Sequence, residues 1–227
     1  MDPLILALLG VIAMFVLIIL HVPLGVSMAL VGVVGFAQIV DWGPAISLMA
    51  SEPAAAMSNL DIAVIPLFML MGSLATVGGL GTDIYEVAYA LIGHRRGGLA
   101  TTTIVASAGF GSVCGSGVAT TATFSRVALP EMLKRNYAPS LAAGSVAAGG
   151  TLGIIVPPSS MMILYAVLTE QSVLQLFTAA VIPAILAVVL YIAAIQIKVR
   201  MDPASAPKGV RLPLNERLRA LGQGWGV

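Results

Sequence analysis

The sequence predicts an all-α integral membrane protein, a multi-span helical bundle, and its composition and charge distribution are the reasons. Of 227 residues, 59% are hydrophobic and 9% are charged, whereas a soluble domain carries roughly a quarter charged residues. About 20 consecutive apolar residues are enough to cross the hydrocarbon core of a bilayer. Runs of at least that length contain no Asp, Glu, Lys or Arg at residues 3–40, 62–82, 97–125, 136–169 and 171–197.

Residues 1–79 are predicted to form scaffold-like transmembrane helices. The first run breaks at His21-Val22-Pro23, because a proline disfavours helix in the residue before it. Spans are therefore expected at about 4–20 and 23–40. A third span is expected at 62–79.

Two segments near these spans are predicted to lie at the membrane surface. Residues 44–60 are interrupted by Glu52 and Pro53 and are interpreted as a surface or partly re-entrant segment. Residues 80–97 are predicted to form an amphipathic interfacial helix, either a plain connector or an arm that ties a moving domain to a fixed one. Its apolar stripe has helical spacing and consists of Ile84, Val87, Ala88, Leu91 and Ile92.

A transport-type region is predicted at 98–197, and it begins with a re-entrant helical hairpin at about 98–135. The uncharged run has a glycine cluster in its middle, at 109–117. Basic pairs flank it at 95–96 and 134–135, and short loops rich in Lys and Arg stay cytoplasmic. A hairpin leaves both pairs on one side of the membrane and a single crossing separates them, so the hairpin is favoured.

The hairpin is followed by a discontinuous helix at about 138–168 and a span at about 172–197. The half-helix is expected to end near Gly149-Gly150, where its free carbonyls offer oxygen ligands to a hard cation such as Na⁺. A helix restarts after Pro157-Pro158-Ser159, since proline suits a first helical turn. Its N-terminus favours a carboxylate. Two such breaks brought together make a cavity lined by non-helical backbone.

The basic residues also predict an orientation. The tendency of loops rich in Lys and Arg to stay cytoplasmic applies to every loop of the chain. It places the N-terminus in the periplasm and the end at residue 227 in the cytoplasm. Residues 198–227 then form a cytoplasmic linker. Every Lys and Arg except Arg126 lies in a predicted cytoplasmic segment.

Several strings resemble the large membrane (permease, DctM-type) subunit of tripartite ATP-independent periplasmic (TRAP) transporters. They are PLFMLMGSLATVGGLG, GSVCGSGVATTATFSRVALPEMLKRNY and AAGGTLGIIVPPSSMMILYAVLTEQS. The resemblance implies one repeat of an inverted-repeat, elevator-type transporter in the bacterial inner (cytoplasmic) membrane. It implies Na⁺-coupled symport of a small organic acid, with Na⁺ as the coupling ion and no other cofactor or metal.

The resemblance also implies partners: a small TRAP membrane subunit, a periplasmic solute-binding protein and the lipid bilayer, with no nucleic acid. The family has two repeats, whereas this sequence resembles the N-terminal half. We expect the chain to be a fragment, since Trp225 stands where a further span is expected. The alternative is a second polypeptide that supplies the second repeat. By itself, the 227-residue chain is expected not to transport.

The breaks and the resemblance together define the candidate site residues. The Na⁺ ligands are predicted to come from Ser112, Gly115, Ser116, Gly150, Thr151 and Gly153. The substrate is predicted to contact Thr120, Thr121, Arg126, Pro157, Pro158 and Ser159. The alternative for Ser112, Gly115 and Ser116 is close helix packing. For Gly150, Thr151 and Gly153 it is a glycine-induced kink, and for Arg126 it is an interfacial position.

No catalytic residue is predicted, and two other function classes are considered. An intramembrane hydrolase would need a base within reach of Ser116, but both histidines, His21 and His94, lie at predicted membrane edges. A passive ion or solute channel would be expected to show a ring of pore charges or a filter repeat. Saturable, Na⁺-dependent uptake separates a transporter from a channel.

Overall fold

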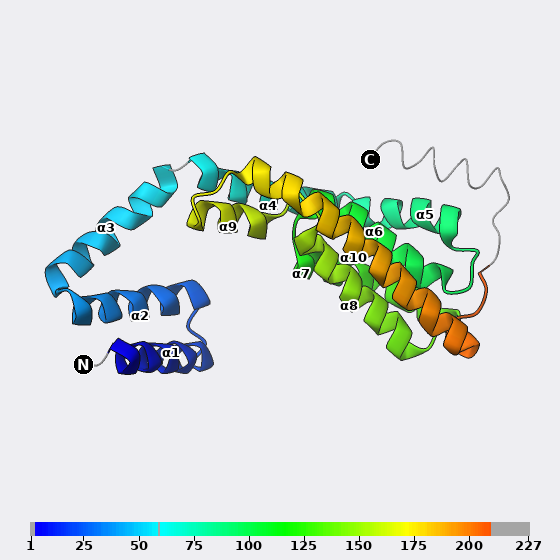
Figure 1. The fold of residues 1–227 in the computed structure, drawn as a ribbon, viewed down its shortest axis with the longest axis horizontal. Coiled ribbons are helices and arrows are strands. Elements are labelled where there is room, and N and C mark those ends of the chain that lie inside the picture. The colour runs from blue at the N-terminus through cyan, green and yellow to red at the C-terminus, as the bar shows by residue number, and fades with distance from the viewer. Residues whose placement is uncertain (1–2, 59, 210–227) are drawn as a thin grey trace. The chain divides into compact units, whose positions relative to one another are not determined.

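The computed structural model describes residues 3–58 and 60–209, and this part of the chain is helical and contains no β-strand (Figure 1). The chain divides into two compact units, Met1–Leu60 and Asp61–Val227. The predicted all-α fold is therefore confirmed for the described residues. The end of the predicted linker, Trp225 included, lies outside them.

In the first unit the described residues form α1 (Pro3–Ile19), α2 (Leu24–Ile39) and α3 (Trp42–Ser58). The predicted break between the first two helices is confirmed: His21 has φ +64° and Pro23 is the N-cap of α2. Glu52 and Pro53 interrupt the apolar run but not the helix, because α3 is continuous with Pro53 inside it; the surface or partly re-entrant location of this segment stays a prediction. A proline removes one amide donor, and the remaining bonds along the helix hold the segment together.

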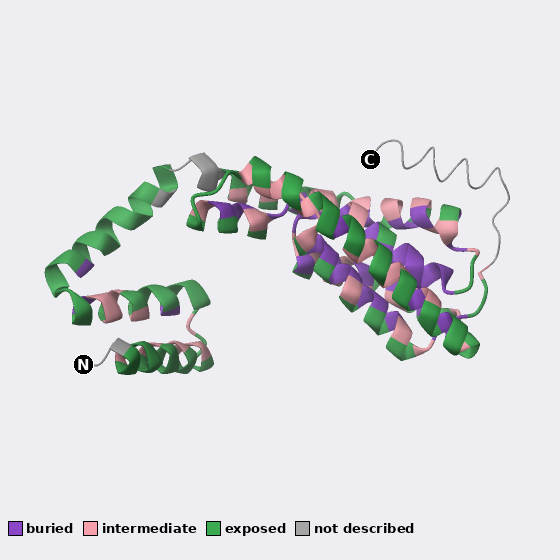
Figure 2. Ribbon diagram, in the orientation of Figure 1, coloured by how far each residue is buried: buried purple, intermediate pink, exposed green. Residues whose placement is uncertain are grey.

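The second unit contains a core of three packed helices that other helices cover. Its elements are α4 (Leu60–Val77), α5 (Leu80–Ile92), α6 (Gly98–Cys114), α7 (Gly117–Lys134), α8 (Pro139–Ile155), α9 (Ser160–Leu168), α10 (Val173–Met201) and a 3₁₀ turn η1 (Pro203–Ser205). Buried residues gather where α6, α7 and α8 meet (Figure 2). Phe110 of α6 and Phe124 of α7 are fully buried there, in an edge-to-face contact with ring centroids 5.9 Å apart.

The helix α5 lies within the segment that the sequence predicts as an amphipathic arm, and it packs on the core. Tyr85 and Ala88 are buried in the core cluster, whereas Leu91 is exposed. The buried face of α5 is thus rotated from the predicted stripe towards Tyr85, because the tyrosine ring reaches Phe124 of α7, 6.2 Å away between centroids.

The Arg135 side chain pairs with Glu131 at the end of α7 and fastens this end to α5 through a hydrogen bond to Tyr89. Arg135 Nη2 lies 2.7 Å from Glu131 Oε1, and Arg135 Nη1 donates a hydrogen bond of 2.6 Å to Tyr89 Oη. Burial acts to lower the pKa of Arg135, but the bonds to Glu131 and Tyr89 outweigh it and raise this pKa. The guanidinium therefore stays charged and holds the two helices together.

By length and composition, α10 is the one helix within the described residues that is able to span a membrane alone. Two further spans result if each bent pair of helices counts as one: Val64–Val77 with α5, bent by 63°, and α8 with α9, bent by 43°. The helices α1, α2 and α6 are apolar but shorter.

Candidate functional site

The tip of the predicted hairpin is a two-residue turn between α6 and α7. Gly115 has φ +59°, a left-handed conformation that glycine adopts without steric cost. Ser116 is the N-cap of α7, and its Oγ accepts a hydrogen bond of 3.3 Å from the Ala119 amide. The residues predicted as a hairpin tip therefore form one, with the carbonyl end of α6 and the amide end of α7 side by side.

The second break lies later in the chain than the sequence analysis expects. The predicted end near Gly149-Gly150 is wrong: α8 continues to Ile155, and the interruption falls at 156–159. Glycine lacks a side chain but keeps its N–H, so the helix passes through Gly149 and Gly150 at a modest cost. Pro157 and Pro158 have no N–H to donate, and the helix ends just before them.

The glycines of α8 instead allow α6 and α7 to approach closely. A Cβ atom on Gly153 would lie 2.9 Å from the Ser116 carbonyl oxygen, and one on Gly111 would lie 2.8 Å from Gly153 Cα. A Cβ atom on Gly150 would overlap Thr121 Oγ1. Gly150 and Gly153 therefore permit close helix packing next to the hairpin tip, a role that the sequence analysis considers only for Ser112, Gly115 and Ser116.

The structure brings the two breaks together. Ser160, the first residue of α9, donates hydrogen bonds to the Gly115 carbonyl oxygen from its Oγ at 2.9 Å and from its amide at 3.4 Å. The start of α9 is thereby fixed to the hairpin tip. One helix C-terminus and two helix N-termini, those of α6, α7 and α9, meet at this point.

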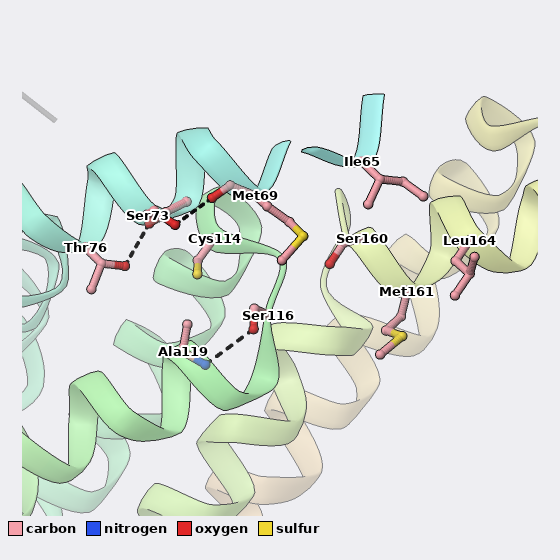
Figure 3. Close-up of a pocket in the computed structure, with 11 residues that line it drawn as sticks. Ile65, Met69, Ser73, Thr76, Cys114, Ser116, Ala119, Ser160, Met161 and Leu164 are labelled. Atoms are coloured by element: carbon pink, nitrogen blue, oxygen red, sulfur yellow. Dashed lines mark hydrogen bonds between the residues drawn. The ribbon is translucent and has the colours of Figure 1, made fainter. Parts of the chain in front are cut away.

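A cavity of about 420 Å³ opens beside this junction (Figure 3). The hairpin tip, the start of α9 and one side of α4 form its walls. The lining residues are Ile65, Met69, Gly72, Ser73, Thr76, Cys114, Ser116, Ala119, Ser160, Met161 and Leu164. No charged side chain is among them, so the backbone dipoles and hydroxyl groups supply the polarity of the cavity.

The contribution of α4 was not predicted, because the segment was interpreted only as a scaffold span. Gly72 allows it to touch the tip: a Cβ atom there would lie 2.9 Å from the Cys114 carbonyl oxygen. Phe68 lies against Gly115, and the Thr76 hydroxyl donates a hydrogen bond of 2.7 Å to the Gly72 carbonyl oxygen at the cavity wall. The signal in the sequence is the spacing of Gly72 and Thr76, which places a small and a polar residue on one face of an apolar helix.

Two of the predicted ion ligands and one substrate residue border the junction itself. Ser116 lines the cavity and Gly115 forms the tip. Ser159, the N-cap of α9, is fully buried, and no hydrogen-bond partner of its Oγ is found among the described residues. Pro157 and Pro158 are half-buried in the break between α8 and α9.

The other hydroxyl groups in the predicted set bond to nearby carbonyl groups. Thr120 is buried and donates to the Ser116 carbonyl oxygen at 2.8 Å, whereas Ser112 donates to the Gly109 carbonyl oxygen at 2.7 Å. Thr121, Gly150 and Thr151 line a separate, open hollow between α7 and α8.

Arg126 is exposed on α7 and does not line the cavity. It follows Ser116 by ten residues, which is roughly 15 Å along a helix. The structure therefore places Arg126 away from the hairpin tip and from the cavity.

Comparison with known proteins identifies the family. The family model described as "Tripartite ATP-independent periplasmic transporter, DctM component" matches residues 11–225. The C4-dicarboxylate TRAP transporter large permease protein DctM of Pseudomonas aeruginosa is 38% identical over 174 residues, which cover 74% of this chain and 39% of the relative. Its namesake in Vibrio cholerae is 34% identical over 170 residues, covering 74% and 37%.

A third relative covers almost the whole chain. The ectoine/5-hydroxyectoine TRAP transporter large permease protein UehC of Ruegeria pomeroyi is 30% identical over 211 residues, which cover 92% of this chain and 49% of the relative. The chain thus spans about half the length of these relatives or less, which matches an N-terminal half. The relatives are named as transporter permeases and not as enzymes. The chain therefore belongs to the family of DctM components of TRAP transporters and is a membrane-embedded protein of that family.

Proposed function

We propose that the chain forms the N-terminal half of a Na⁺-coupled permease that imports a small organic acid across the bacterial inner membrane. The proposed partners are a second repeat, a small TRAP membrane subunit and a periplasmic binding protein that delivers the acid. Support comes from relatives named as C4-dicarboxylate permeases and from the cavity at the hairpin tip. That cavity is the observation that carries the proposal.

The proposed ion position is beside the hairpin tip. Ser116 supplies a hydroxyl oxygen at the cavity wall, and the last turn of α6 supplies carbonyl oxygens that have no amide partner further along the helix. Oxygens of this kind suit a hard cation. Gly150 and Gly153 take part indirectly, because their missing side chains allow the tip to lie against α8.

The proposed carboxylate position is at the start of α9. A helix N-terminus presents free amides and a positive dipole end, which attract an anion. The buried Ser159 Oγ, which has no hydrogen-bond partner among the described residues, adds a donor at the same place. Because a cation and a carboxylate attract each other, binding of Na⁺ at the tip raises the affinity for the acid.

The proposed movement separates α4 from the tip. The cavity lies between α4, which belongs to the predicted scaffold, and the hairpin, which belongs to the predicted transport region. Alternating access in such transporters requires one part to move against the other around the site. The contacts of Phe68 and Gly72 with the tip are therefore proposed to form in one state and to open in the other.

Replacement of Ser116 tests the ion position. In the complete transporter, Ser116→Ala and Ser116→Gly are both expected to raise the Na⁺ concentration for half-maximal uptake by about tenfold, since a lost ligand bond of roughly 1.5 kcal/mol corresponds to that factor. Uptake into proteoliposomes, measured over a range of Na⁺ concentrations, checks this result.

The two variants separate ion binding from helix capping. Glycine at an N-cap costs only a few tenths of a kcal/mol, whereas alanine costs about 1 kcal/mol. A pure capping role would thus leave Ser116→Gly near normal, and that outcome would contradict the proposal. Ser140→Ala, at an exposed serine of α8, is the matched control and is expected to keep the normal Na⁺ response.

Labelling of introduced cysteines tests the proposed orientation. In a protein in which Cys114 is replaced by serine, single cysteines at positions 96, 134 and 200 are expected to react with an impermeant maleimide only from the cytoplasm. Cysteines at 41 and 170 are expected to react only from the periplasm. The reason is the excess of Lys and Arg near the first set. Labelling of intact cells and of inverted vesicles gives the two readings, and opposite sides for 96 and 134 would replace the hairpin with a single crossing.

A further inference from the structure

The segment that follows α10 is fastened to two loops of the second unit. The Ser205 carbonyl oxygen accepts a hydrogen bond of 2.9 Å from the Ala138 amide, and Ser205 and Ala206 are buried. Lys208 forms an antiparallel bridge with Arg96. The α5–α6 loop and the end of α10 lie at the same end of this unit (Figure 1).

The bridge between Arg96 and Lys208 brings positively charged side chains close to one another. Side chains directly opposite each other in an antiparallel pair have Cβ atoms about 4.5–5.5 Å apart, and like charges at that distance repel. Arg96 and Lys208 occupy such positions, and Arg95 precedes Arg96. Arg200 is close by, because its neighbour Val199 packs against Gly97. We call Arg95, Arg96, Arg200 and Lys208 the basic patch.

Carboxylates within the described residues do not neutralise the basic patch. Their ion pairs join Arg135 to Glu131 and Lys198 to Asp202, and neither pair includes a patch residue. All four side chains of the patch are exposed. The pairing of Arg96 with Lys208 thus brings together cations whose repulsion an external anion would relieve.

Exposed apolar side chains adjoin the basic patch. Ile197 and Met201 flank Arg200 on α10 and are 57% and 80% exposed, and Leu91 at the end of α5 is 51% exposed. Such a combination of cations with apolar side chains fits a molecule that has an anionic head and hydrocarbon tails. The membrane location of the family supplies that class of molecule.

We propose that the basic patch binds the phosphate headgroup of an anionic phospholipid, whose acyl chains lie along Ile197 and Met201. Basic pockets at the ends of membrane helices bind such headgroups, and each Lys or Arg near an anionic surface contributes about 1 kcal/mol. The bound phosphate lies between Arg96 and Lys208 and offsets their repulsion. This inference depends on membrane embedding and not on the transported solute or the coupling ion.

Native mass spectrometry of the full-length protein, released from detergent with defined lipids, tests the proposal. The wild type is expected to retain phosphatidylglycerol in preference to phosphatidylcholine. The triple variant Arg95→Gln, Arg96→Gln, Lys208→Gln is expected to lose at least about tenfold in phosphatidylglycerol retention. The charge-conserving variant Arg95→Lys, Arg96→Lys, Lys208→Arg is expected to retain it.

A second measurement locates the lipid. A photoreactive amino acid at Met201 is expected to capture phosphatidylglycerol selectively, whereas one at Leu168, 74% exposed and beyond the opposite end of α10, is expected to show no selectivity. Equal retention of both lipids by the wild type, unchanged retention in the glutamine variant, or displacement of the lipid by millimolar inorganic phosphate would each overturn the proposal.

Discussion

A disulfide between Thr76→Cys and the native Cys114 is expected to stop uptake almost completely, and reduction is expected to restore it. Thr76 and Cys114 both line the cavity between α4 and the hairpin tip, and Gly72, one turn before Thr76, packs against the Cys114 backbone. A disulfide keeps the two Cα atoms within about 7 Å of each other, so the separated state is lost for as long as the bond is intact. Uptake by proteoliposomes after mild oxidation, and again after dithiothreitol, gives the result.

The control for this prediction is the double variant Thr76→Cys, Cys114→Ser, which has no partner thiol. Its uptake is expected to change neither on oxidation nor on reduction. Full uptake by a protein whose cross-link is verified by mass spectrometry would show that α4 and the tip remain together throughout transport. The proposed movement would then be wrong, while the cavity itself would still be available as a binding site.

Gly153→Leu is expected to have the second large effect, on stability as well as uptake. Already the first added carbon, the Cβ atom, would lie 2.9 Å from the Ser116 carbonyl oxygen and 2.5 Å from Thr120 Oγ1. Backbone cannot move aside as a flexible side chain does, and overpacking of this kind costs about 1–3 kcal/mol or more. We therefore expect α7 to be pushed from α8, with a lower thermal midpoint in detergent and a loss of uptake.

Gly144→Leu is the matched control on the same helix. A Cβ atom on Gly144 meets nothing within 4 Å, and replacement of glycine in a helix interior favours the helix by nearly 1 kcal/mol. This control is expected to be as stable as the wild type or slightly more stable. Equal thermal midpoints for Gly153→Leu and Gly144→Leu would contradict the packing described for Gly153.

The turn between α6 and α7 was predictable because the glycine cluster around Gly115 weakens the helix there. The return of the chain to the same membrane face, which the basic pairs on either side favour, stays a prediction. The break after α8 was predicted in the right segment but too early, since glycines both weaken a helix and allow close packing. The neighbouring helices decide which effect prevails, and the sequence of α8 alone does not show which helices pack against it.

The part played by α4 was missed for a related reason, since the spacing of Gly72 and Thr76 marks one face of the helix but does not identify what lies against that face. Ser73 and Thr76 are ordinary residues in an apolar span until the fold places the hairpin tip against them. In α3, Glu52 and Pro53 interrupt the apolar run without interrupting the helix. Local chemistry thus predicted the breaks that contain glycine turns or double prolines, and missed the features that depend on distant partners.

The bridge between Arg96 and Lys208 has a consequence for the order in which the protein assembles. Its partners are about 110 residues apart, and translation at 5–20 residues per second separates their synthesis by roughly 5–20 s. The helices α5 to α8, whose contacts are more local, have time to insert and pair during that interval. The bridge from the α5–α6 loop to Lys208 therefore forms only after α10 has been synthesised, when α5 to α8 are already available to pack.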